Sequence, residues 1–374
     1  MVGSSSVLGN RRLKATGKAV IPMSSISAKL LRWYDANRRE LPWRVAPGGV
    51  VDPYRVWVSE IMLQQTTVAT ITSYFGNFVA RWPTIEKLAE ASLDEILHAW
   101  QGLGYYSRAH NLHKCAREVV ANWGGTFPRD EAYLRSLTGI GPYTAAAISA
   151  IAYGHKATPV DGNVERVMAR LHAVETPLPK AKLEIRHLAE SLTPEQRAGD
   201  FAQAMMDLGA LVCRPKAPNC SACPLKTTCL GRKGGDAARF PVRRPKKPRP
   251  TRYCTLFWLV REDGAVSVRR RPEKGLLGGM MEFPSTPWSE VRSVPSIAAD
   301  HAPVNADWLP LDGTVEHVFT HFRLVLEICT ASVAKACPEN VQWCRPSDFD
   351  GLALPTVMKK VARHMAAIRA GHES

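Results

Sequence analysis

Four closely spaced cysteines limit the fold of this chain more than any other feature of its sequence. A segment of seventeen residues holds four of the nine cysteines, namely Cys213, Cys220, Cys223 and Cys229. Zinc sites usually present two close pairs of Cys or His, whereas only Cys220 and Cys223 form such a pair here. A cubane iron–sulfur cluster accepts this uneven spacing more readily. The pattern therefore favours a [4Fe-4S] cluster bound by all four thiolates, with zinc as the alternative.

Prolines and basic residues alternate with these cysteines. Three prolines keep the segment out of helix, which would hold the thiolates in fixed directions. We expect the loop to present positive charge outward through the residues between the ligands, Arg214, Lys216 and Lys226.

The remaining cysteines show no ligand spacing. An odd number of cysteines in a long chain indicates a reducing compartment, where thiols stay free. We expect five buried free thiols: Cys115, Cys254, Cys329, Cys337 and Cys344.

The charge of the chain indicates a polyanionic partner. The 374 residues carry a net charge of +15, although their 45% hydrophobic and 22% charged residues are ordinary for a globular protein. Nucleic acid is the first expectation and an acidic membrane surface the second. No apolar run is long enough for a transmembrane helix. We therefore expect a cytoplasmic protein, associated with the nucleoid if its source is bacterial.

Changes in pattern along the chain divide it into parts. Apolar residues recur at three- and four-residue spacing from about residue 26 to 211, which predicts an all-α bundle of short helices. Residues 232–252 hold nine basic residues, one acid and four prolines, a composition that predicts a linker. Short alternating runs follow and predict an α+β unit with an antiparallel or mixed sheet.

The second unit has recognisable strands and a final helix. Residues 253–260 and 265–268 are expected to be strands around a turn at 262–264, residues 316–329 a further strand, and residues 354–368 a closing helix. The first part of the chain is basic, rich in serine and free of acids, which predicts a disordered tail. The expected boundaries are a tail at 1–24, a helical domain at 25–231, the linker at 232–252 and a second domain at 253–370.

Two glycines separate apolar helical stretches between residues 137 and 148. Gly139 and Gly141 let the backbone approach another molecule closely, and Pro142 suits a first helical position. Free amide groups at a helix N-terminus bind phosphate without reading base sequence. A glycine pair alone would favour an ordinary tight turn, but the basic charge and the downstream cysteine loop favour phosphate binding.

This hairpin, the Pro-Val-Asp-Gly-Asn-Val segment at 159–164 and the four cysteines together resemble the helix-hairpin-helix DNA glycosylase superfamily with a [4Fe-4S] loop. Within it, the chain resembles the adenine DNA glycosylases of the MutY type. The resemblance covers residues 26–368 and is strongest from 41 to 229. The stretches Leu-Pro-Trp-Arg at 41–44, Val-Ser-Glu-Ile-Met-Leu-Gln-Gln-Thr at 58–66 and Gly-Leu-Gly-Tyr-Tyr-Ser-Arg at 102–108 match motifs of that family.

Two carboxylates fit the chemistry that such an enzyme needs. Cleavage of an N-glycosidic bond requires a proton for the departing base and negative charge near an oxocarbenium-like sugar. Glu60 lies among apolar residues that would keep a carboxyl protonated, and the resemblance makes it the acid that protonates adenine. Asp161 precedes a helical stretch and could either cap that helix or stay ionised against the cation.

Position 143 separates two subclasses of the superfamily. Glycosylases that also cut the strand, of the endonuclease III type, carry a lysine there that forms a Schiff base. This chain has Tyr143. The resemblance therefore implies a monofunctional enzyme that leaves the abasic site intact, with Tyr143 supporting the transition state.

Further contacts with DNA are implied by the resemblance alone. Enzymes that extrude a base fill the vacated stack with wedges. Gln65 and Tyr105 match the intercalating residues of the family, and Thr66 and Leu103 match its contacts to the orphaned 8-oxoguanine. Pocket or phosphate contacts are implied for Arg44, Gln64, Asn163 and Gln203.

The C-terminal domain resembles a Nudix domain from residue 275 onward. Nudix hydrolases need a cluster of glutamates to hold magnesium, and no such cluster follows here, which disfavours a hydrolase. The resemblance implies instead a module that recognises 8-oxoguanine. The Phe-Ser-His loop of the family stands here as Phe319, Thr320 and His321. The methyl group of Thr320 adds bulk and restricts the rotamer, which bears on lesion discrimination.

The sequence thus predicts a monomer that binds double-stranded DNA containing an adenine mispair and removes adenine opposite 8-oxoguanine or guanine. Two alternatives stay open. One is a bifunctional glycosylase with lyase activity, and the other is an iron–sulfur DNA-binding protein without chemistry.

Overall fold

The computed structural model describes residues 23–46, 49–245, 248–292, 298–334 and 341–372. These residues form two compact units that each combine distant parts of the chain. We name residues 23–38 and 160–242 the cysteine unit, and residues 39–159 together with those from 243 onward the hairpin unit.

The cysteine unit is helical, as predicted. Residues that recur at helical spacing, such as Ile26 and Leu30, are fully buried in it. Its elements are α1 (Met23–Asn37), α9 (Gly162–Leu171), α10 (Lys182–Leu192), α11 (Ala198–Asp207), the π-helical turn η1 (Leu208–Val212), α12 (Leu230–Lys233) and the 3₁₀ turn η2 (Ala237–Arg239).

The first part of the hairpin unit is also helical, as predicted. Its core holds Trp57, Phe75 and Trp100, none of which is accessible to solvent. The helices are α2 (Pro53–Leu63), α3 (Val68–Arg81), α4 (Ile85–Glu90), α5 (Leu93–Ala99), α6 (Ser107–Trp123), α7 (Glu131–Ser136) and α8 (Pro142–Tyr153).

Local signals fix the start of α2. The side chain of Asp52 accepts a hydrogen bond from the Tyr54 amide at 2.9 Å, and Pro53 occupies the first helical position. Residues 56–62 are all buried, because α2 is packed inside the helical bundle. Glu60 is therefore carried into the interior of the bundle together with Ser59 and five apolar residues.

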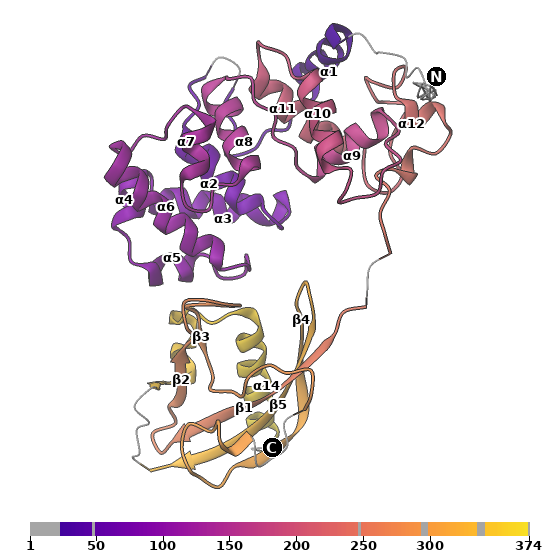
Figure 1. Ribbon diagram of the computed structural model, residues 1–374. Coiled ribbons are helices and arrows are strands. Elements are labelled where there is room, and N and C mark those ends of the chain that lie inside the picture. Colours follow the sequence, from indigo (N-terminus) through magenta and orange to yellow (C-terminus); the bar gives the residue numbers. More distant parts are fainter. Residues whose placement is uncertain (1–22, 47–48, 246–247, 293–297, 335–340, 373–374) are drawn as a thin grey trace, which may run out of the picture. The chain divides into compact units, whose positions relative to one another are not determined.

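The second part of the hairpin unit is a mixed sheet with helices, as predicted (Figure 1). The strand order is β3-β2-β1-β5-β4, and β6 also pairs with β2. The elements are β1 (Thr251–Arg261), β2 (Val266–Arg270), β3 (Met281–Glu282), β4 (Leu309–Val318), β5 (Arg323–Val333), β6 (Gln342–Cys344), the 3₁₀ turn η3 (Pro346–Gly351) and α14 (Thr356–His372).

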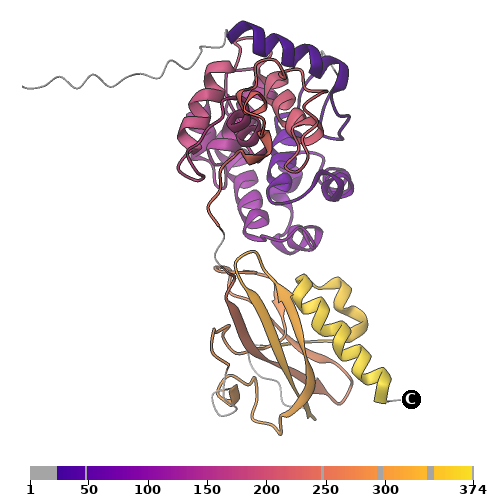
Figure 2. The same cartoon turned by 90° about the vertical axis from the view of Figure 1, so that its right-hand side faces the viewer.

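The centre of the sheet is a parallel pair. β1 and β5 run parallel, with Thr251 opposite Arg323 and Trp258 opposite Thr330. Residues 254–259 of β1 are all buried, which is typical of a strand covered on both faces. Figure 2 shows α14 lying along one face of the sheet, where Met358 and Val361 enter the core.

One strand prediction is wrong. Residues 316–329 were expected to form a single strand, but β4 ends at Val318 and β5 begins at Arg323. The chain reverses between them through a hydrogen bond from the Phe319 amide to the Phe322 carbonyl at 2.8 Å. The alternation of side chains does not reveal the reversal, because Phe319 and Phe322 continue the apolar pattern on both sides of the polar tip. The turn places Thr320 and His321 at an exposed tip.

The predicted linker differs from the structure in its first half. Ala237 and Phe240 are buried in the cysteine unit, and the Leu178 amide bonds to the Val242 carbonyl at 2.9 Å. Basic composition pointed to a solvated segment, but two apolar side chains suffice to dock it. Residues 1–22 of the expected tail lie outside the described residues, and α1 already begins at Met23. The predicted domain boundaries stay predictions.

The cysteines outside the loop are free but not all buried. Among the described ones, Cys115 and Cys254 are buried, whereas Cys329 and Cys344 are half-buried, which corrects that expectation. Cys337 lies outside the described residues. Burial raises the pKa of Cys254 to about 12 and so keeps that thiol protonated.

Within the described residues, none of the helices combines the length and the apolar character needed to cross a membrane.

Candidate active site

Glu60 and Tyr143 meet in the interior of the hairpin unit. The Tyr143 hydroxyl donates a hydrogen bond of 2.7 Å to Oε2 of Glu60. Glu60 is only 5% exposed, because it lies on the buried face of α2. α2 packs against α8, whose second residue is Tyr143. The helix pair thus joins two residues that the sequence singled out separately.

The surroundings of this pair are closely packed. Ala145, Ala146 and Ala147 of α8 are almost fully buried, and their small side chains let α8 lie close to its neighbours. Gln64, at the end of α2, donates through Nε2 to the Thr144 hydroxyl at 3.5 Å. The predicted pocket residue Gln64 therefore lies next to the Glu60–Tyr143 pair.

The hairpin before α8 has the expected shape. Gly139 has φ +77°, and a Cβ there would lie 2.7 Å from Cβ of Asn111, so only glycine fits. Gly141 caps α8 without a side-chain hydrogen bond, and Pro142 is the first helical residue, as predicted. The space around Gly141 is open. The helix therefore offers uncapped amide groups on an accessible side, which is the arrangement that binds phosphate.

α6 holds this hairpin in place. The Glu118 carboxylate accepts hydrogen bonds from the Thr138 amide at 2.9 Å and from the Thr138 hydroxyl at 2.6 Å. The hairpin is thus anchored before any ligand binds.

Asp161 caps α9 in the cysteine unit. Its Oδ1 accepts hydrogen bonds from the amides of Asn163 at 2.9 Å and Val164 at 2.7 Å, and its Oδ2 accepts one from the Asn163 side chain at 2.8 Å. These bonds cap the N-terminus of α9. The structure thus shows the cap, and the catalytic role of Asp161 stays a prediction.

A chain of hydrogen bonds leads from Asp161 to the cysteine loop. The Asn163 side chain accepts a bond from Nη2 of Arg166 at 2.7 Å, and Nε of Arg166 donates to the Cys213 carbonyl at 2.8 Å. Gly209 lets η1 approach α9, since a Cβ there would lie 2.6 Å from Cβ of Asn163. In this structure the amide of Asn163, predicted to contact DNA, is engaged within the protein.

The four cysteines of the loop line one cavity of about 30 Å³. Among the described residues, no three Cys, His, Asp or Glu side chains converge closely enough to hold a single metal ion. Four thiols around one cavity match the four-thiolate ligand set of a [4Fe-4S] cluster. The residues present therefore fit an iron–sulfur cluster.

Arg170 forms the inner wall of that cavity. Its side chain is 2% exposed and donates to the carbonyls of Phe240 at 3.0 Å, Arg214 at 2.7 Å and Pro215 at 3.0 Å. Nη1 also lies 3.3 Å from Sγ of Cys213. A buried guanidinium thus holds the loop and directs positive charge at a predicted ligand. The basic residues Arg214, Lys216 and Lys226 are exposed, as predicted.

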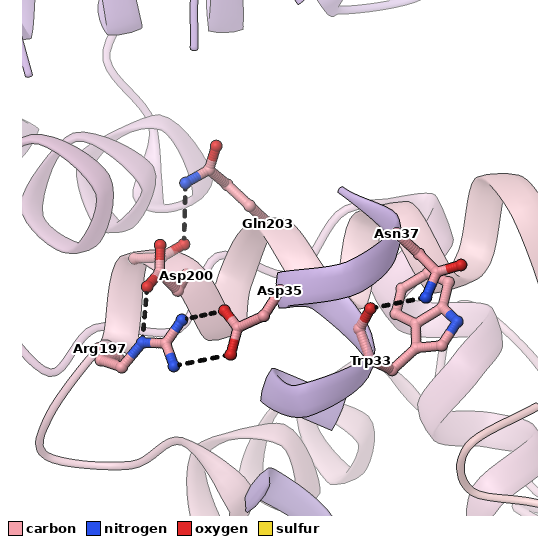
Figure 3. A network of polar contacts seen from close by, with 7 residues as sticks. Trp33, Asp35, Asn37, Arg197, Asp200 and Gln203 are labelled. Atoms are coloured by element: carbon pink, nitrogen blue, oxygen red, sulfur yellow. Dashed lines mark hydrogen bonds and ion pairs between the residues drawn. The ribbon is translucent and has the colours of Figure 1, made fainter. Parts of the chain in front are cut away.

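Two predicted phosphate contacts form hydrogen bonds with nearby backbone carbonyls. Nη1 of Arg44 donates to the Arg39 carbonyl at 3.3 Å, and Nε2 of Gln203 donates to the Gly199 carbonyl at 3.3 Å. Figure 3 shows Gln203 beside an ion-pair network in which Arg197 joins Asp35 of α1 to Asp200 of α11. These pairs are about half exposed and tie two helices of the cysteine unit together.

The residues predicted to enter DNA lie on two turns of the hairpin unit. Gln65, directly after α2, and Tyr105, directly before α6, are exposed and have φ of +64° and +48°. Thr66 is half-buried, and its hydroxyl donates to the Gln64 carbonyl at 3.3 Å. Leu103 is 5% exposed, so its side chain belongs to the core and only its backbone could contact a base.

The tripeptide expected to recognise the lesion, residues 319–321, has one packed residue followed by two exposed ones. Phe319 packs against Trp288, His317 and Phe322 with ring centroids 4.6 to 5.5 Å apart. Thr320 and His321 are exposed. The Thr320 hydroxyl forms a hydrogen bond with the Tyr105 hydroxyl. A predicted intercalating residue and a predicted lesion contact, from distant parts of the chain, thus meet within the hairpin unit.

Sequence reasoning missed three arginines: Arg108, Arg166 and Arg170. The helical pattern gave no signal for Arg170, because Arg170 shares the polar side of α9 with Asn163 and Arg166. Arg108 is the last residue of the Gly-Leu-Gly-Tyr-Tyr-Ser-Arg motif at 102–108, and the motif alone gives this arginine no role. For Arg166 nothing in the pattern distinguishes it from a solvated helix residue.

Comparisons with known proteins show the family of this chain. Residues 58–195 match the family described as HhH-GPD superfamily base excision DNA repair protein, and residues 255–364 match the NUDIX domain family. The adenine DNA glycosylase of Homo sapiens is 34% identical over 408 residues, which cover 92% of this chain and 74% of that protein. The chain belongs to the adenine DNA glycosylase family.

A second adenine DNA glycosylase is similar to this chain to the same degree. The protein of Buchnera aphidicola subsp. Schizaphis graminum is 33% identical, over 80% of this chain and 85% of that protein. The structure of a thermostable thymine-DNA glycosylase is 29% identical, with a TM-score of 0.52 over 57% of this chain and 97% of that chain. Membership of the adenine DNA glycosylase family confirms the resemblance, the fold class and the assignment to base excision repair.

Proposed function

We propose that this chain is a monofunctional glycosylase that removes adenine mispaired with 8-oxoguanine, and more weakly with guanine, from double-stranded DNA. The observation that carries the proposal is the hydrogen bond between buried Glu60 and half-buried Tyr143. Glu60 provides an acid for the departing base, and Tyr143 stands at the position where the resemblance implies a lysine in strand-cutting glycosylases.

Glu60 supplies the proton. Its carboxyl is 5% exposed and lies at the end of the hydrogen bond from Tyr143, where it can act as the general acid that the departing base requires. The proton passes from Glu60 to the adenine as the bond between the base and C1′ of the sugar breaks. The electron pair of that bond leaves with the base, and the sugar becomes an oxocarbenium ion. Water then adds to C1′ and releases a proton.

Asp161 stabilises the cation. Its carboxylate is held by three hydrogen bonds and by the N-terminus of α9, so that it needs little reorganisation when positive charge develops. Glu60 and Asp161 belong to different compact units, and their joint action is implied by the family. The two carboxyls differ in their surroundings, because Glu60 is buried in α2 and accepts a bond from Tyr143, whereas Asp161 caps the N-terminus of α9.

Tyr143 makes the enzyme monofunctional. A Schiff base requires an amine that attacks the sugar, and a phenol cannot form one. The Tyr143 hydroxyl instead orients the Glu60 carboxyl through the bond of 2.7 Å. The abasic site therefore stays intact after the base has left.

The cysteine loop holds a [4Fe-4S] cluster through Cys213, Cys220, Cys223 and Cys229. When bound, the cluster would cross-link the loop as a structural clamp. Arg170 fixes the backbone of the loop from inside, and the exposed basic residues Arg214, Lys216 and Lys226 face the phosphates of DNA.

The C-terminal domain checks the partner of the adenine. Thr320 stands at the tip of the β4–β5 turn beside Tyr105, where a hydroxyl can bond to a lesion in the opposite strand. The enzyme acts as a cytoplasmic monomer in this proposal.

Single-turnover excision tests the function. Short duplexes would hold adenine opposite 8-oxoguanine, guanine or thymine, and strand breaks would be scored with and without hot alkali. We expect breaks only after alkali, strongest opposite 8-oxoguanine. Breaks without alkali, together with trapping by borohydride, would show a lyase. Tight binding without excision, in protein with its cluster, would show a binding protein without chemistry.

A further inference from the structure

The two turns that carry Gln65 and Tyr105 share an unusual backbone. Both residues adopt the left-handed region, with φ of +64° and +48°, which L-residues other than glycine seldom occupy. Such conformations persist where the surroundings hold them, and they occur at functional sites. The contacts that hold these two turns are therefore informative.

One guanidinium holds both turns. Nη1 of Arg108 donates to three carbonyls at the end of α2, those of Ile61 at 2.8 Å, Met62 at 3.2 Å and Gln64 at 2.5 Å. Nη2 of the same side chain donates to two carbonyls of the other turn, those of Leu103 at 3.0 Å and Gly104 at 3.1 Å. The two terminal nitrogens of the guanidinium thus connect the residues directly before Gln65 and Tyr105.

The environment of Arg108 is dry. The residue is 9% exposed, and its guanidinium carbon lies 5.4 Å from the centre of the Trp100 ring and 5.7 Å from that of the Tyr105 ring. Desolvation lowers the pKa of Arg108 to about 10, so the side chain is still charged at neutral pH. Among the described residues no carboxylate pairs with it. The carbonyls, including those left open by the end of α2, balance its charge.

We infer that Arg108 is a positioning residue that joins the two turns into one rigid support and so fixes the spacing between Gln65 and Tyr105. The inference rests on the proposed function and on the family resemblance, which implies that these two side chains fill the space left by the extruded adenine. A wedge works only if its parts enter the stack together. Preorganisation by one shared cation achieves this without cost at the moment of binding.

The geometry requires arginine. Five donors in a rigid plane can reach two groups of carbonyls at once, whereas the ammonium of lysine is a single point on a flexible stem. Arg108→Lys keeps the charge and most of the volume but can serve only one turn at a time. Arg108→Lys therefore distinguishes the role of Arg108 in joining the two turns from its role as a buried side chain.

The experiment is a double-mutant cycle on base extrusion. A duplex would hold 2-aminopurine, a fluorescent adenine analogue, opposite 8-oxoguanine, and all proteins would carry Glu60→Gln to prevent excision. Arg108→Lys is measured with the wedges present and again with both removed by Gln65→Ala and Tyr105→Ala. With wedges, we expect extrusion to slow by about tenfold to a hundredfold. Without them, we expect a change of less than about twofold, since coupled residues are not additive.

The control is Arg81→Lys, at an exposed residue of the same unit that pairs with Glu95. Equal slowing with and without wedges would overturn the inference, because it would make Arg108 a general structural residue. Extrusion at the parental rate in Arg108→Lys would overturn it too. If circular dichroism shows that Arg108→Lys is unfolded, Arg108→Gln replaces it. Failure of both to fold would assign Arg108 to the core and reject the inference.

The same protein without Glu60→Gln separates this inference from the proposed function. If it does not remove adenine, the proposed function fails. If it removes adenine while Arg108→Lys extrudes the base normally, only the inference fails.

Discussion

The Tyr143 hydroxyl donates a hydrogen bond of 2.7 Å to Oε2 of Glu60, across 83 positions of the chain. The bond fixes the orientation of one carboxyl oxygen of Glu60. A glutamine at position 60 could still accept that bond through its amide oxygen, so the packing of α2 and α8 need not change.

Glu60→Gln should therefore abolish excision without unfolding the protein. Loss of a general acid removes about 10²- to 10⁴-fold in rate. We expect single-turnover excision opposite 8-oxoguanine to fall by at least that factor, with DNA affinity unchanged in a gel-shift titration. Glu95→Gln, at an exposed residue of α5, is the control and should keep full activity. Appreciable excision by Glu60→Gln would remove Glu60 from the mechanism.

Asp161 can be tested as a cap and as a charge separately. Asp161→Asn should retain capping, because asparagine also accepts bonds from helix amides, but should lose the negative charge. We expect stability within about 0.5 kcal/mol of the parent and a loss of at least about 10²-fold in excision.

The matched control for Asp161 is Asp130, which caps α7 through the amides of Ala132 and Tyr133. Asp130→Ala should cost about 1 kcal/mol in thermal or denaturant unfolding and leave excision intact. If Asp161→Asn were fully active, its carboxylate would be no more than a cap.

Removal of one cysteine should release the metal. We expect the purified protein to hold about four irons per chain, with the broad visible absorbance of a cluster, and Cys220→Ser to lose most of both. Cys344→Ser, at a half-buried thiol outside the loop, should change neither. One zinc and no iron in the parent would establish the alternative metal.

Arg170 should matter for the same loop. Arg170→Gln removes the donor near Sγ of Cys213 and several of the bonds to loop carbonyls. We expect faster loss of iron to a chelator and a shifted cluster potential, because hydrogen bonds to the sulfurs tune that potential. Arg186→Gln, at an exposed residue of α10, is the control. A parental rate of iron loss and a parental potential would show that Arg170 does not act on the cluster.

Gly141 should matter for DNA and not for the fold. Its φ of −86° is open to any residue, and a Cβ there meets no atom within 4 Å. Gly141→Ala should leave the melting temperature unchanged or slightly higher, but its methyl group would stand before the N-terminus of α8. We expect DNA affinity to fall several-fold and to depend less steeply on salt concentration.

Gly139→Ala provides the contrast to Gly141→Ala. At φ +77° and against Asn111, it should lower stability as well as binding. Unchanged DNA affinity in Gly141→Ala would mean that the hairpin does not approach phosphate.

The sequence determined the features that depend on local pattern. Cysteine spacing, the glycines of the hairpin and the periodicity of the helices are fixed by neighbouring residues, so the cysteine loop, the turn at Gly139 and the start of α8 at Pro142 could all be read from the chain. The choice of Tyr143 over lysine is likewise a matter of residue identity.

Tertiary structure decided which distant groups meet. Only the packing of α2 on α8 brings Tyr143 to Glu60, and only folding buries Arg108 between two turns and Arg170 beside the cysteines. The reversal at Phe319 was hidden for the same kind of reason, since alternation along a strand does not record where the chain turns back. Local propensity reports the neighbours of a residue along the chain, whereas a site depends on neighbours in space.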